Sequence, residues 1–164
     1  MNNVWQQIAS TFAAEFSDLK DVSEITTVII RLSMAALLGG ILGLEREQRG
    51  KAAGIKTHML VAIGSALFVL VPMQAGVSEA EMSRVMQGII TGIGFLGAGA
   101  ILKGHDEKDL KGLTTAAGIW VTSAIGIAAG LGRESLAILC TVFALVVLLA
   151  MPRIVDVYDS KEKQ

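Results

Sequence analysis

Residues 135–151 read S-L-A-I-L-C-T-V-F-A-L-V-V-L-L-A-M and contain no charged side chain. A bilayer core about 30 Å thick needs roughly twenty apolar residues of helix, at 1.5 Å each, to cross it. Similar apolar windows precede this stretch at residues 26–44, 57–75, 84–102 and 113–131. Because backbone polar groups in lipid must be hydrogen-bonded within the segment, these windows are expected to be helices. The sequence therefore predicts an all-α, polytopic transmembrane bundle with about five spans.

The composition agrees with this expectation. Hydrophobic residues make up 52% of the 164 residues and charged residues 18%, whereas a soluble domain carries about 25% charged residues. A formal net charge of -1 and an aromatic content of 5% argue against nucleic-acid binding. The lone Cys140 lies in an apolar run and is expected to pack, not to act as a nucleophile. No cleavable signal peptide is expected, because no Lys or Arg precedes Lys20.

The distribution of Lys and Arg predicts the orientation in the membrane. Basic residues gather after the first, third and fifth windows: Arg46, Arg49, Lys51, Lys56, Lys103, Lys108, Lys111, Arg153, Lys161 and Lys163. The hinge at residues 76–83 contains Glu79 and Glu81 but no Lys or Arg. The hinge after the fourth window has only Arg133, beside Glu134. Because cytoplasmic loops are rich in Lys and Arg, the N-terminus is expected outside and the C-terminus in the cytoplasm.

Residues 1–24 are predicted to form a separate amphipathic segment. The apolar residues of its helical face are Trp5, Ile8, Phe12, Phe16 and Leu19. Such a helix lies in the external membrane–water interface in contact with lipid, or it caps the bundle or a partner. Residues 25–153 form the expected transmembrane domain, and residues 154–164 a polar C-terminal tail.

The 18 glycines indicate close contacts between helices, because small residues spaced by four let backbones approach in a membrane. The glycines expected to pack in this way are Gly39, Gly43, Gly88, Gly92, Gly94, Gly97, Gly99, Gly118, Gly126 and Gly130. Each glycine inside a helix costs roughly 0.8–1 kcal/mol relative to alanine, so this density implies a compensating role. That role is tight packing or, in the third window, a locally unwound helix that lines a cavity.

Ionisable residues in or beside the windows are candidates for function. Near the external end, Arg31 can reach the interface or pair with Glu79 or Glu81. Glu81 can alternatively pair with Arg84, three residues later. These groups form either a structural ion pair or an entry site for cations.

The cytoplasmic end holds a second polar group. Glu45 can pair with Arg49 across one helical turn. Thr57 is a candidate N-cap, and His58 is a pH-sensitive group or a capping partner. No nucleophile–base pair, metal-ligand spacing or phosphate loop is visible in the sequence. We therefore expect no enzymatic activity, no catalytic residues and no resident cofactor, with Mg²⁺ left open as a ligand or substrate.

Two stretches closely resemble the MgtC/SapB family of bacterial inner-membrane proteins. The first is RLSMAALLGGILGLEREQRGKAAGIKTHML, from Arg31 to Leu60. The second is RVMQGIITGIGFLGAGAIL from Arg84, followed by GLTTAAGIWVTSAIG, which ends at Gly126. The resemblance covers about a hundred residues, and its GIGFLGAG and GLTTAA blocks are specific to the family.

The resemblance implies a multi-pass protein of the bacterial inner membrane. The family was once labelled a magnesium transporter, and its members are tied to survival under magnesium limitation, in acid or inside host cells. They are thought to modulate membrane partners such as ATP synthase. The residues that the motifs mark are Arg31, Glu45, Arg46, Lys51, Gly54, Thr57, His58, Arg84, Gly92, Gly94, Phe95, Gly97, Gly99, Thr114, Thr115 and Trp120.

This chain departs from the family pattern at three places. Glu81-Met82 stands where an Asp-Pro pair is usual, and Lys56 stands where an Arg precedes Thr-His. The soluble C-terminal domain of many members is not expected after the fifth window.

Two hypotheses follow for function. The first is a non-enzymatic modulator that acts through intramembrane contacts, as a homodimer or other homo-oligomer or with another membrane complex. The second is a carrier or channel for Mg²⁺ or another cation, for which Glu45, Glu81 and Thr91 are the candidate polar groups.

Overall fold

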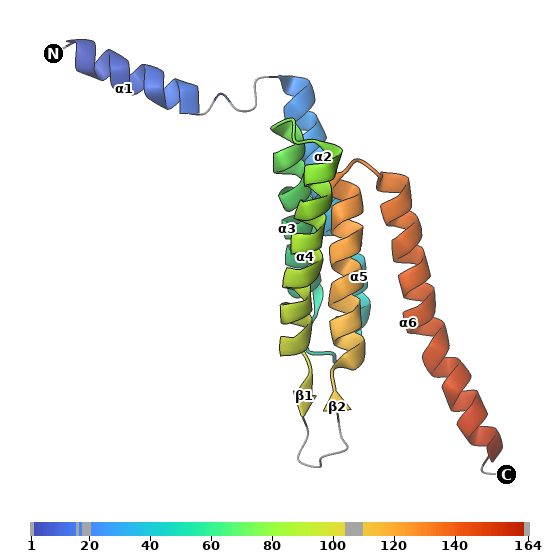
Figure 1. Cartoon of the computed structure of the whole chain (residues 1–164). Coiled ribbons are helices and arrows are strands. Elements are labelled where there is room, and N and C mark those ends of the chain that lie inside the picture. The colour runs from blue at the N-terminus through green and yellow to red at the C-terminus, as the bar shows by residue number, and fades with distance from the viewer. Residues whose placement is uncertain (1, 16, 18–20, 104–109, 163–164) are drawn as a thin grey trace. The chain divides into compact units, whose positions relative to one another are not determined.

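The computed structural model describes residues 2–15, 17, 21–103 and 110–162, and it describes side chains for residues 3–15, 17, 21–101 and 111–151. The described chain is helical (Figure 1). Its helices are α1 (Asn2–Glu15), α2 (Val22–Gln48), α3 (Ile55–Gln74), α4 (Glu79–Gly99), α5 (Leu113–Gly130) and α6 (Glu134–Glu162). A short antiparallel pair, β1 (Leu102–Lys103) with β2 (Leu110–Lys111), joins α4 to α5. The chain divides into two compact units, residues 1–30 and 31–164.

The first unit contains α1 and the first turns of α2. Trp5, Ile8 and Phe12 of α1 are all exposed, as an apolar face that meets lipid or a partner would be. The helix ends at Glu15, before the predicted end of the amphipathic segment. Phe16 and Leu19, also predicted for this face, lie outside the described residues.

The helices of the second unit coincide closely with the predicted windows. Among the described residues, the helices long and apolar enough to cross a membrane are α2, α3, α5 and the segment Glu134–Met151 of α6. Helix α4 is long enough, with 21 residues, but Arg84, Gln87 and the repeated glycines lower its mean hydropathy. About five spans were expected, and four of the described helices are long and apolar enough to be spans.

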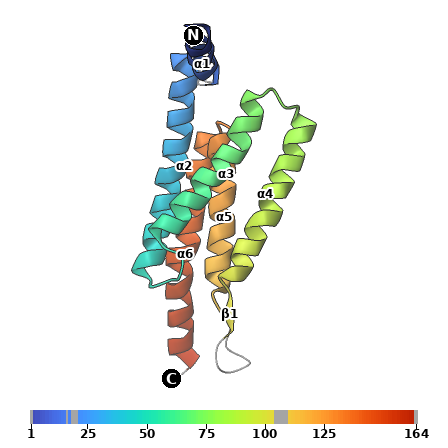
Figure 2. The same cartoon turned by 90° about the vertical axis from the view of Figure 1, so that its left-hand side faces the viewer.

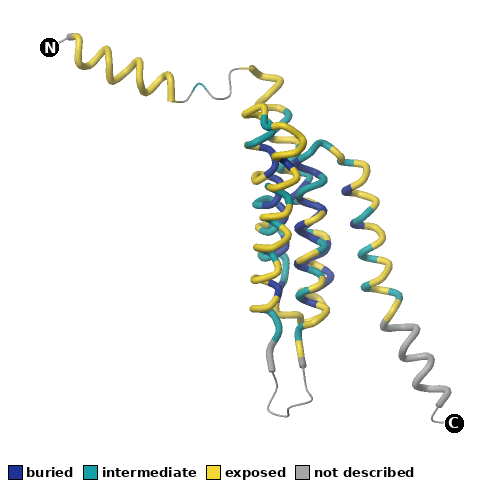
Figure 3. Tube along the Cα trace, viewed as in Figure 1, coloured by how far each residue is buried: buried dark blue, intermediate teal, exposed yellow. Residues whose placement is uncertain are grey.

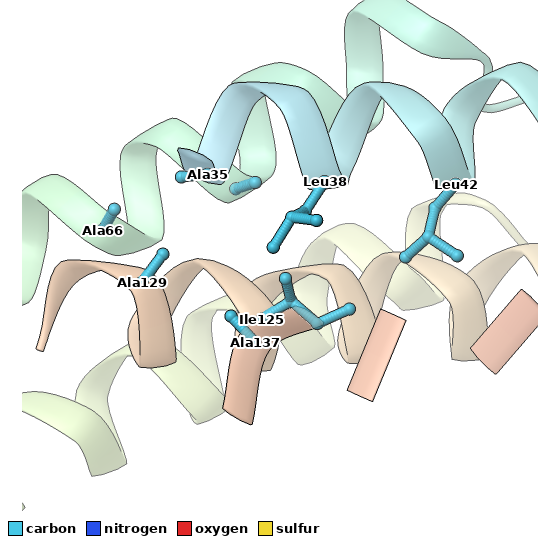
Figure 4. Packing of buried hydrophobic residues seen from close by; sticks show 8 residues of the cluster. Ala35, Leu38, Leu42, Ala66, Ile125, Ala129 and Ala137 are labelled. Atoms are coloured by element: carbon cyan, nitrogen blue, oxygen red, sulfur yellow. The ribbon is translucent and has the colours of Figure 1, made fainter. Parts of the chain in front are cut away.

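Small side chains form the core of the second unit (Figure 4). Alanines at positions 35, 62, 66, 129 and 137 are each buried, together with Leu38, Leu42 and Ile125. Helix α5 contacts α3, α4 and α6, and Figure 2 shows α2 and α4 on opposite sides of α3 and α5. Buried residues concentrate on α2, α3 and α5, whereas α4 and α6 are largely exposed (Figure 3).

The region predicted as a polar tail continues the last helix. Helix α6 runs without interruption from Glu134 to Glu162. Figure 1 shows α6 beginning beside α5 and diverging from it toward the C-terminus.

Helix α4 begins with a complete capping box. Ser78 is the N-cap, and its hydroxyl donates to the Glu81 carboxylate at 2.6 Å. The same carboxylate accepts the Ser78 backbone N–H at 3.1 Å. The Ser78 hydroxyl oxygen in turn accepts the Glu81 backbone N–H at 3.4 Å, so the backbone N–H groups of Ser78 and Glu81 both have partners. Glu81 therefore contacts Ser78, and neither of the alternative partners that the sequence offered, Arg31 and Arg84, is paired with it among the described residues.

Replacing Ser78 with alanine is expected to weaken this first turn and to change the titration of Glu81. The hydrogen bonds from the Ser78 hydroxyl and backbone N–H lower the pKa of Glu81 below its usual value. A lowered pKa means that the cap stabilises the fold fully at neutral pH and loses this effect as the pH falls through that pKa. An NMR titration of Ser78→Ala should show the pKa of Glu81 rising toward its ordinary value. An unchanged pKa would contradict the capping geometry.

Candidate functional site

A cluster of charged residues lies in the last turn of α2. Glu45 and Arg46 are 7% and 3% exposed, and the Glu45 carboxylate pairs with the Arg46 guanidinium. The Arg49 Nε lies 3.3 Å from the other Glu45 oxygen, as the expected pair across one turn. We call Glu45, Arg46 and Arg49 the charged cluster. Its members hold more positive than negative charge.

The turn that follows positions this cluster. Gly50 adopts a positive φ of 63°, which ends α2 with the left-handed residue typical of a helix C-terminus. The Lys51 N–H then donates to the Arg46 carbonyl at 3.0 Å. Lys51 is thereby held beside the cluster, with its side chain exposed.

His58 lies behind the cluster, in the first turn of α3. It is 1% exposed, and its Nδ1 lies 3.0 Å from the Gly54 carbonyl oxygen. Since a carbonyl can only accept, Nδ1 carries the proton in the neutral ring and Nε2 is left as an acceptor. That Nε2 has no hydrogen-bond partner among the described residues.

The start of α3 differs from the prediction. Gly54 is the N-cap and offers no side-chain bond, and Thr57 lies inside the first turn. The cap comes from α2 instead, because the Glu47 carboxylate accepts the Ile55 N–H at 2.9 Å. A carboxylate at this position also complements the positive end of the α3 dipole.

Glycines bring α2, α3 and α5 into backbone contact. A Cβ added at Gly39 would lie 2.7 Å from the His58 carbonyl oxygen, and one at Gly43 would lie 2.6 Å from the Ile55 Cα. Gly126 and Gly130 of α5 also lie against the backbone of α3. A Cβ at Gly130 would lie 2.5 Å from the Ala66 oxygen. At Gly126 it would overlap the Ala62 carbonyl, and at Gly118 it would lie 3.5 Å from His58 Nε2.

The glycines of α4 are different. A Cβ added at Gly88, Gly92, Gly94 or Gly99 would meet nothing within 4 Å. At Gly97 it would meet the Ala116 Cβ at an ordinary 3.6 Å. The helix is also continuous through all of them, so the alternative of a locally unwound third span is wrong. Among the described residues, the α4 glycines therefore lack the tight packing that was expected, and Gly97 makes an ordinary contact.

Arg31 lies at the opposite end of α5 from His58. Its guanidinium donates to the Gly130 carbonyl at 3.1 Å, in the last turn of α5. A cation is favoured at this negative end of a helix dipole, where carbonyls lack partners. Of the two alternatives for Arg31, reaching the interface or pairing with Glu79 or Glu81, the structure shows no such pair among the described residues, and Arg31 caps α5 instead. Arg84 is exposed.

The remaining candidates are scattered through the unit. Thr115 is buried, Thr114 is exposed, and Trp120 is half exposed. The Thr91 hydroxyl is exposed and donates to the Gln87 carbonyl of its own helix at 2.8 Å. The structure therefore does not bring these residues together with Glu81 or Arg31 into one site.

One polar contact was not expected from the sequence. The Ser65 and Ser123 hydroxyls lie 2.7 Å apart, buried between α3 and α5. Both serines occupy apolar windows, where an interhelical hydrogen bond is the usual partner for a hydroxyl. A serine within each of these apolar windows is the feature of the sequence that could have indicated this contact.

Three cavities adjoin these residues. The apolar cavity, about 430 Å³, lies between α5 and α6 and is lined by His58, Leu42, Val121, Phe143 and Val147 among others. The basic cavity, about 370 Å³, is lined by Arg46, Arg49, Lys51, Thr114, Val147, Leu148 and Met151. The third, about 620 Å³, lies between α3 and α4 and includes Gly88, Gly92 and Ser65 in its wall.

The part of the chain that the structure describes contains no group of three or more His, Cys, Asp or Glu residues able to hold a metal ion. The carboxylates proposed for a cation path are each engaged. Glu45 pairs with Arg46 and Arg49, and Glu81 is bound to Ser78.

Comparison with known proteins identifies the family. The model of the MgtC family matches residues 32–157, from α2 through most of α6. The chain belongs to the MgtC family. The match includes the charged cluster, His58 and the glycine-rich part of α4. With four helices apolar enough to cross a bilayer, this MgtC-family chain is a membrane protein.

Several relatives share extended similarity. Protein SrpB of Synechococcus elongatus is 43% identical over 135 residues, which cover 76% of this chain and 74% of SrpB. "Putative magnesium transporter YhiD" of Escherichia coli K12 is 44% identical over 128 residues, covering 73% of this chain and 58% of YhiD. Protein MgtC of Brucella abortus strain 2308 is 40% identical, and the alignment covers 78% of this chain and 52% of that protein. The chain thus spans only about half the length of some MgtC-family relatives. No solved structure matches it significantly.

Proposed function

We propose that this MgtC-family protein is a non-enzymatic regulator in the bacterial inner membrane that acts by docking α4 against a transmembrane helix of a partner. The glycine-lined groove between α3 and α4 carries the proposal. Gly88 and Gly92 are spaced by four in the α4 wall of this groove, and an added side chain at either would meet nothing within 4 Å. Small residues at this spacing allow another helix to approach closely.

The cost of these glycines favours a partner. Each costs roughly 0.8–1 kcal/mol of helix stability relative to alanine. Elsewhere in the chain that cost is offset by backbone contact, as at Gly39 and Gly126. On α4 no such contact exists within the described residues, apart from Gly97. A helix from another molecule supplies the missing contact in this proposal.

Helix α4 is long enough to serve as a fifth span. At 1.5 Å per residue, 21 residues extend about 30 Å. Phe95 is 87% exposed, and Ile90 and Leu96 are also exposed, as side chains facing lipid or a partner helix would be. With five spans, the basic residues after α2 favour an orientation in which the N-terminus is outside and the charged cluster is at the cytoplasmic side.

The contacts that Glu45 and Glu81 already make also favour regulation rather than transport. Glu45 pairs with Arg46 and Arg49, and Glu81 caps α4. Mg²⁺ favours carboxylates together with water. A cation at either carboxylate would compete with these contacts, which are made by Glu45 and by the Oε2 atom of Glu81.

The resemblance to the family suggests the setting and the partner. We propose a role in adaptation to magnesium limitation, acid or other stress, including the virulence-related settings of the family. The partner is a second copy of this chain or another membrane complex, with ATP synthase as the candidate from the family. Cross-linking in native membranes is the test of this docking.

Substituting leucine at both Gly88 and Gly92 is expected to reduce cross-linked product at least tenfold, because two isobutyl groups would hold the partner helix away. The protein itself should remain inserted and folded, since both positions are open. Ala124→Leu, at an exposed position of α5, is the matched control and should cross-link like the wild type. Undiminished cross-linking of the double variant would reject α4 as the docking face.

The second candidate function is transport of Mg²⁺ or another cation. The name of the relative YhiD and the cavity of about 620 Å³ between α3 and α4 favour it. Ser65 contributes the only polar side chain among the residues lining that cavity. Because Mg²⁺ requires several oxygen ligands, transport by this route would rely on water and backbone carbonyls.

A further inference from the structure

The apolar cavity runs along the helices and not across them. On α5 its wall extends from Thr114 to Val121, about 10 Å at 1.5 Å per residue. The facing wall on α6 runs from Cys140 to Leu148. Phe143 and Val147 are 64% and 54% exposed, so the cavity is open on its outer side. A channel with this direction and lining matches an acyl chain in a bilayer.

The basic cavity continues the apolar one at the end where α2 stops. The two cavities share Thr114, Val147 and Leu148 in their walls. Arg46, Arg49 and Lys51 line the basic cavity, and no acidic side chain is among its lining residues. Glu45 pairs with the two arginines but leaves excess positive charge. Arginine forks suit a phosphate in particular, because they can donate two parallel hydrogen bonds.

His58 supplies an independent indication of a ligand. Its side chain is 1% exposed, its Nε2 has no hydrogen-bond partner among the described residues, and it lines the apolar cavity. A buried polar atom without a partner destabilises the folded protein. With Nδ1 bonded to the Gly54 carbonyl, Nε2 requires a donor, such as a hydroxyl or a water held by a ligand.

From these observations we infer that the protein binds one anionic glycerophospholipid at this place. The phosphate lies against Arg49 and Lys51 in the basic cavity, and one acyl chain lies between α5 and α6. A hydroxyl of the lipid, or a water beside it, donates to His58 Nε2. The lipid fills the space where α6 diverges from α5 and links the two helices. This site includes no residue of α4. The lipid proposal is therefore tested independently of the proposed partner.

The test measures lipids retained by the purified full chain in native mass spectrometry. Phosphatidylglycerol is expected to be retained about tenfold more than phosphatidylcholine with the same chains, since basic residues attract the net negative charge of an anionic lipid. Arg49→Ala/Lys51→Ala should bring the two lipids to nearly equal retention. Lys56→Ala removes an exposed charge that does not line either cavity and should leave the preference unchanged. Equal retention by the wild type, or loss of preference in Lys56→Ala, would overturn the site.

A second arm distinguishes a lipid from a free anion. Ala117→Phe places a ring in the apolar cavity, whereas Ala124→Phe, seven residues later on α5, lies outside its lining. Only Ala117→Phe should reduce retention of phosphatidylglycerol, by about tenfold. Inorganic phosphate at millimolar concentration should not displace the lipid from the wild type. Displacement by phosphate, or full retention by Ala117→Phe, would show that the cavity holds no acyl chain and would reject the inference.

Discussion

Replacing Gly126 with leucine is expected to abolish the folded helical core. A Cβ at this position would overlap the carbonyl oxygen of Ala62 and lie 2.8 Å from its Cα. Both atoms belong to the α3 backbone, so they cannot move without displacing the whole helix. Overpacking a tight core costs about 1–3 kcal/mol where side chains can adjust, and more where they cannot. We expect the variant to aggregate during purification and to show no cooperative thermal transition in detergent.

Gly92→Leu is the matched control for this prediction. It makes the same chemical change in another helix, α4, but the site is open, with nothing within 4 Å. This variant should elute as a single species and unfold at or above the temperature of the wild type, since leucine favours a helix more than glycine does. If Gly126→Leu and Gly92→Leu were equally stable, the close contact between α3 and α5 would be wrong.

Replacing Glu45 with alanine is expected to destabilise the protein by about 3–5 kcal/mol, because it leaves a buried guanidinium without its partner. Arg46 is 3% exposed, so water cannot readily replace the lost carboxylate. Arg46 and Arg49 would also repel each other without the negative charge of Glu45, which contacts both. Thermal unfolding in detergent should show the change as a large fall in midpoint.

The double variant Glu45→Leu/Arg46→Met tests whether the loss comes from the unpaired charge. Apolar residues of similar volume often replace a buried ion pair at little cost, so much of the stability should return. Arg49→Ala should have an effect of about 0–1 kcal/mol, because its side chain is 39% exposed. A double variant as unstable as Glu45→Ala would contradict the buried pair.

The positions of the helices could be predicted from the sequence because each apolar window is bounded by charged or glycine-containing turns. The predicted window 57–75 became α3 at Ile55–Gln74, and the window 113–131 became α5 at Leu113–Gly130. The third window was placed less well. Its helix starts at Glu79, five residues earlier than expected, because the Ser78 capping box begins it.

Contacts between distant residues could not be predicted in this way. The pattern of charges suggested a carboxylate for Arg31, but its partner is the Gly130 carbonyl, a backbone atom that no side-chain pattern reveals. No sequence pattern predicted the partner of Glu47 either, because its carboxylate accepts the backbone N–H of Ile55. The glycine spacing of α4 resembled that of α5, and only the structure distinguishes the open face from the packed one.

The candidate site was only partly visible in the sequence. Glu45, Arg46 and His58 were marked by their resemblance to the family motifs. Their burial, and the free Nε2 of His58, depend on the packing of α3 against Gly39 and Gly118. The apolar and basic cavities depend on the divergence of α6 from α5. No local sequence pattern predicts that divergence.

Magnesium flux into liposomes that contain the purified protein tests most directly whether the chain acts by contact or by transport. We expect no uptake above that of empty liposomes, from protein shown to be inserted and folded, because Glu45 and Glu81 are already engaged. Saturable uptake that is reduced by substitution of Ser65, in the wall of the cavity between α3 and α4, would contradict the account. It would make this MgtC-family chain a cation carrier.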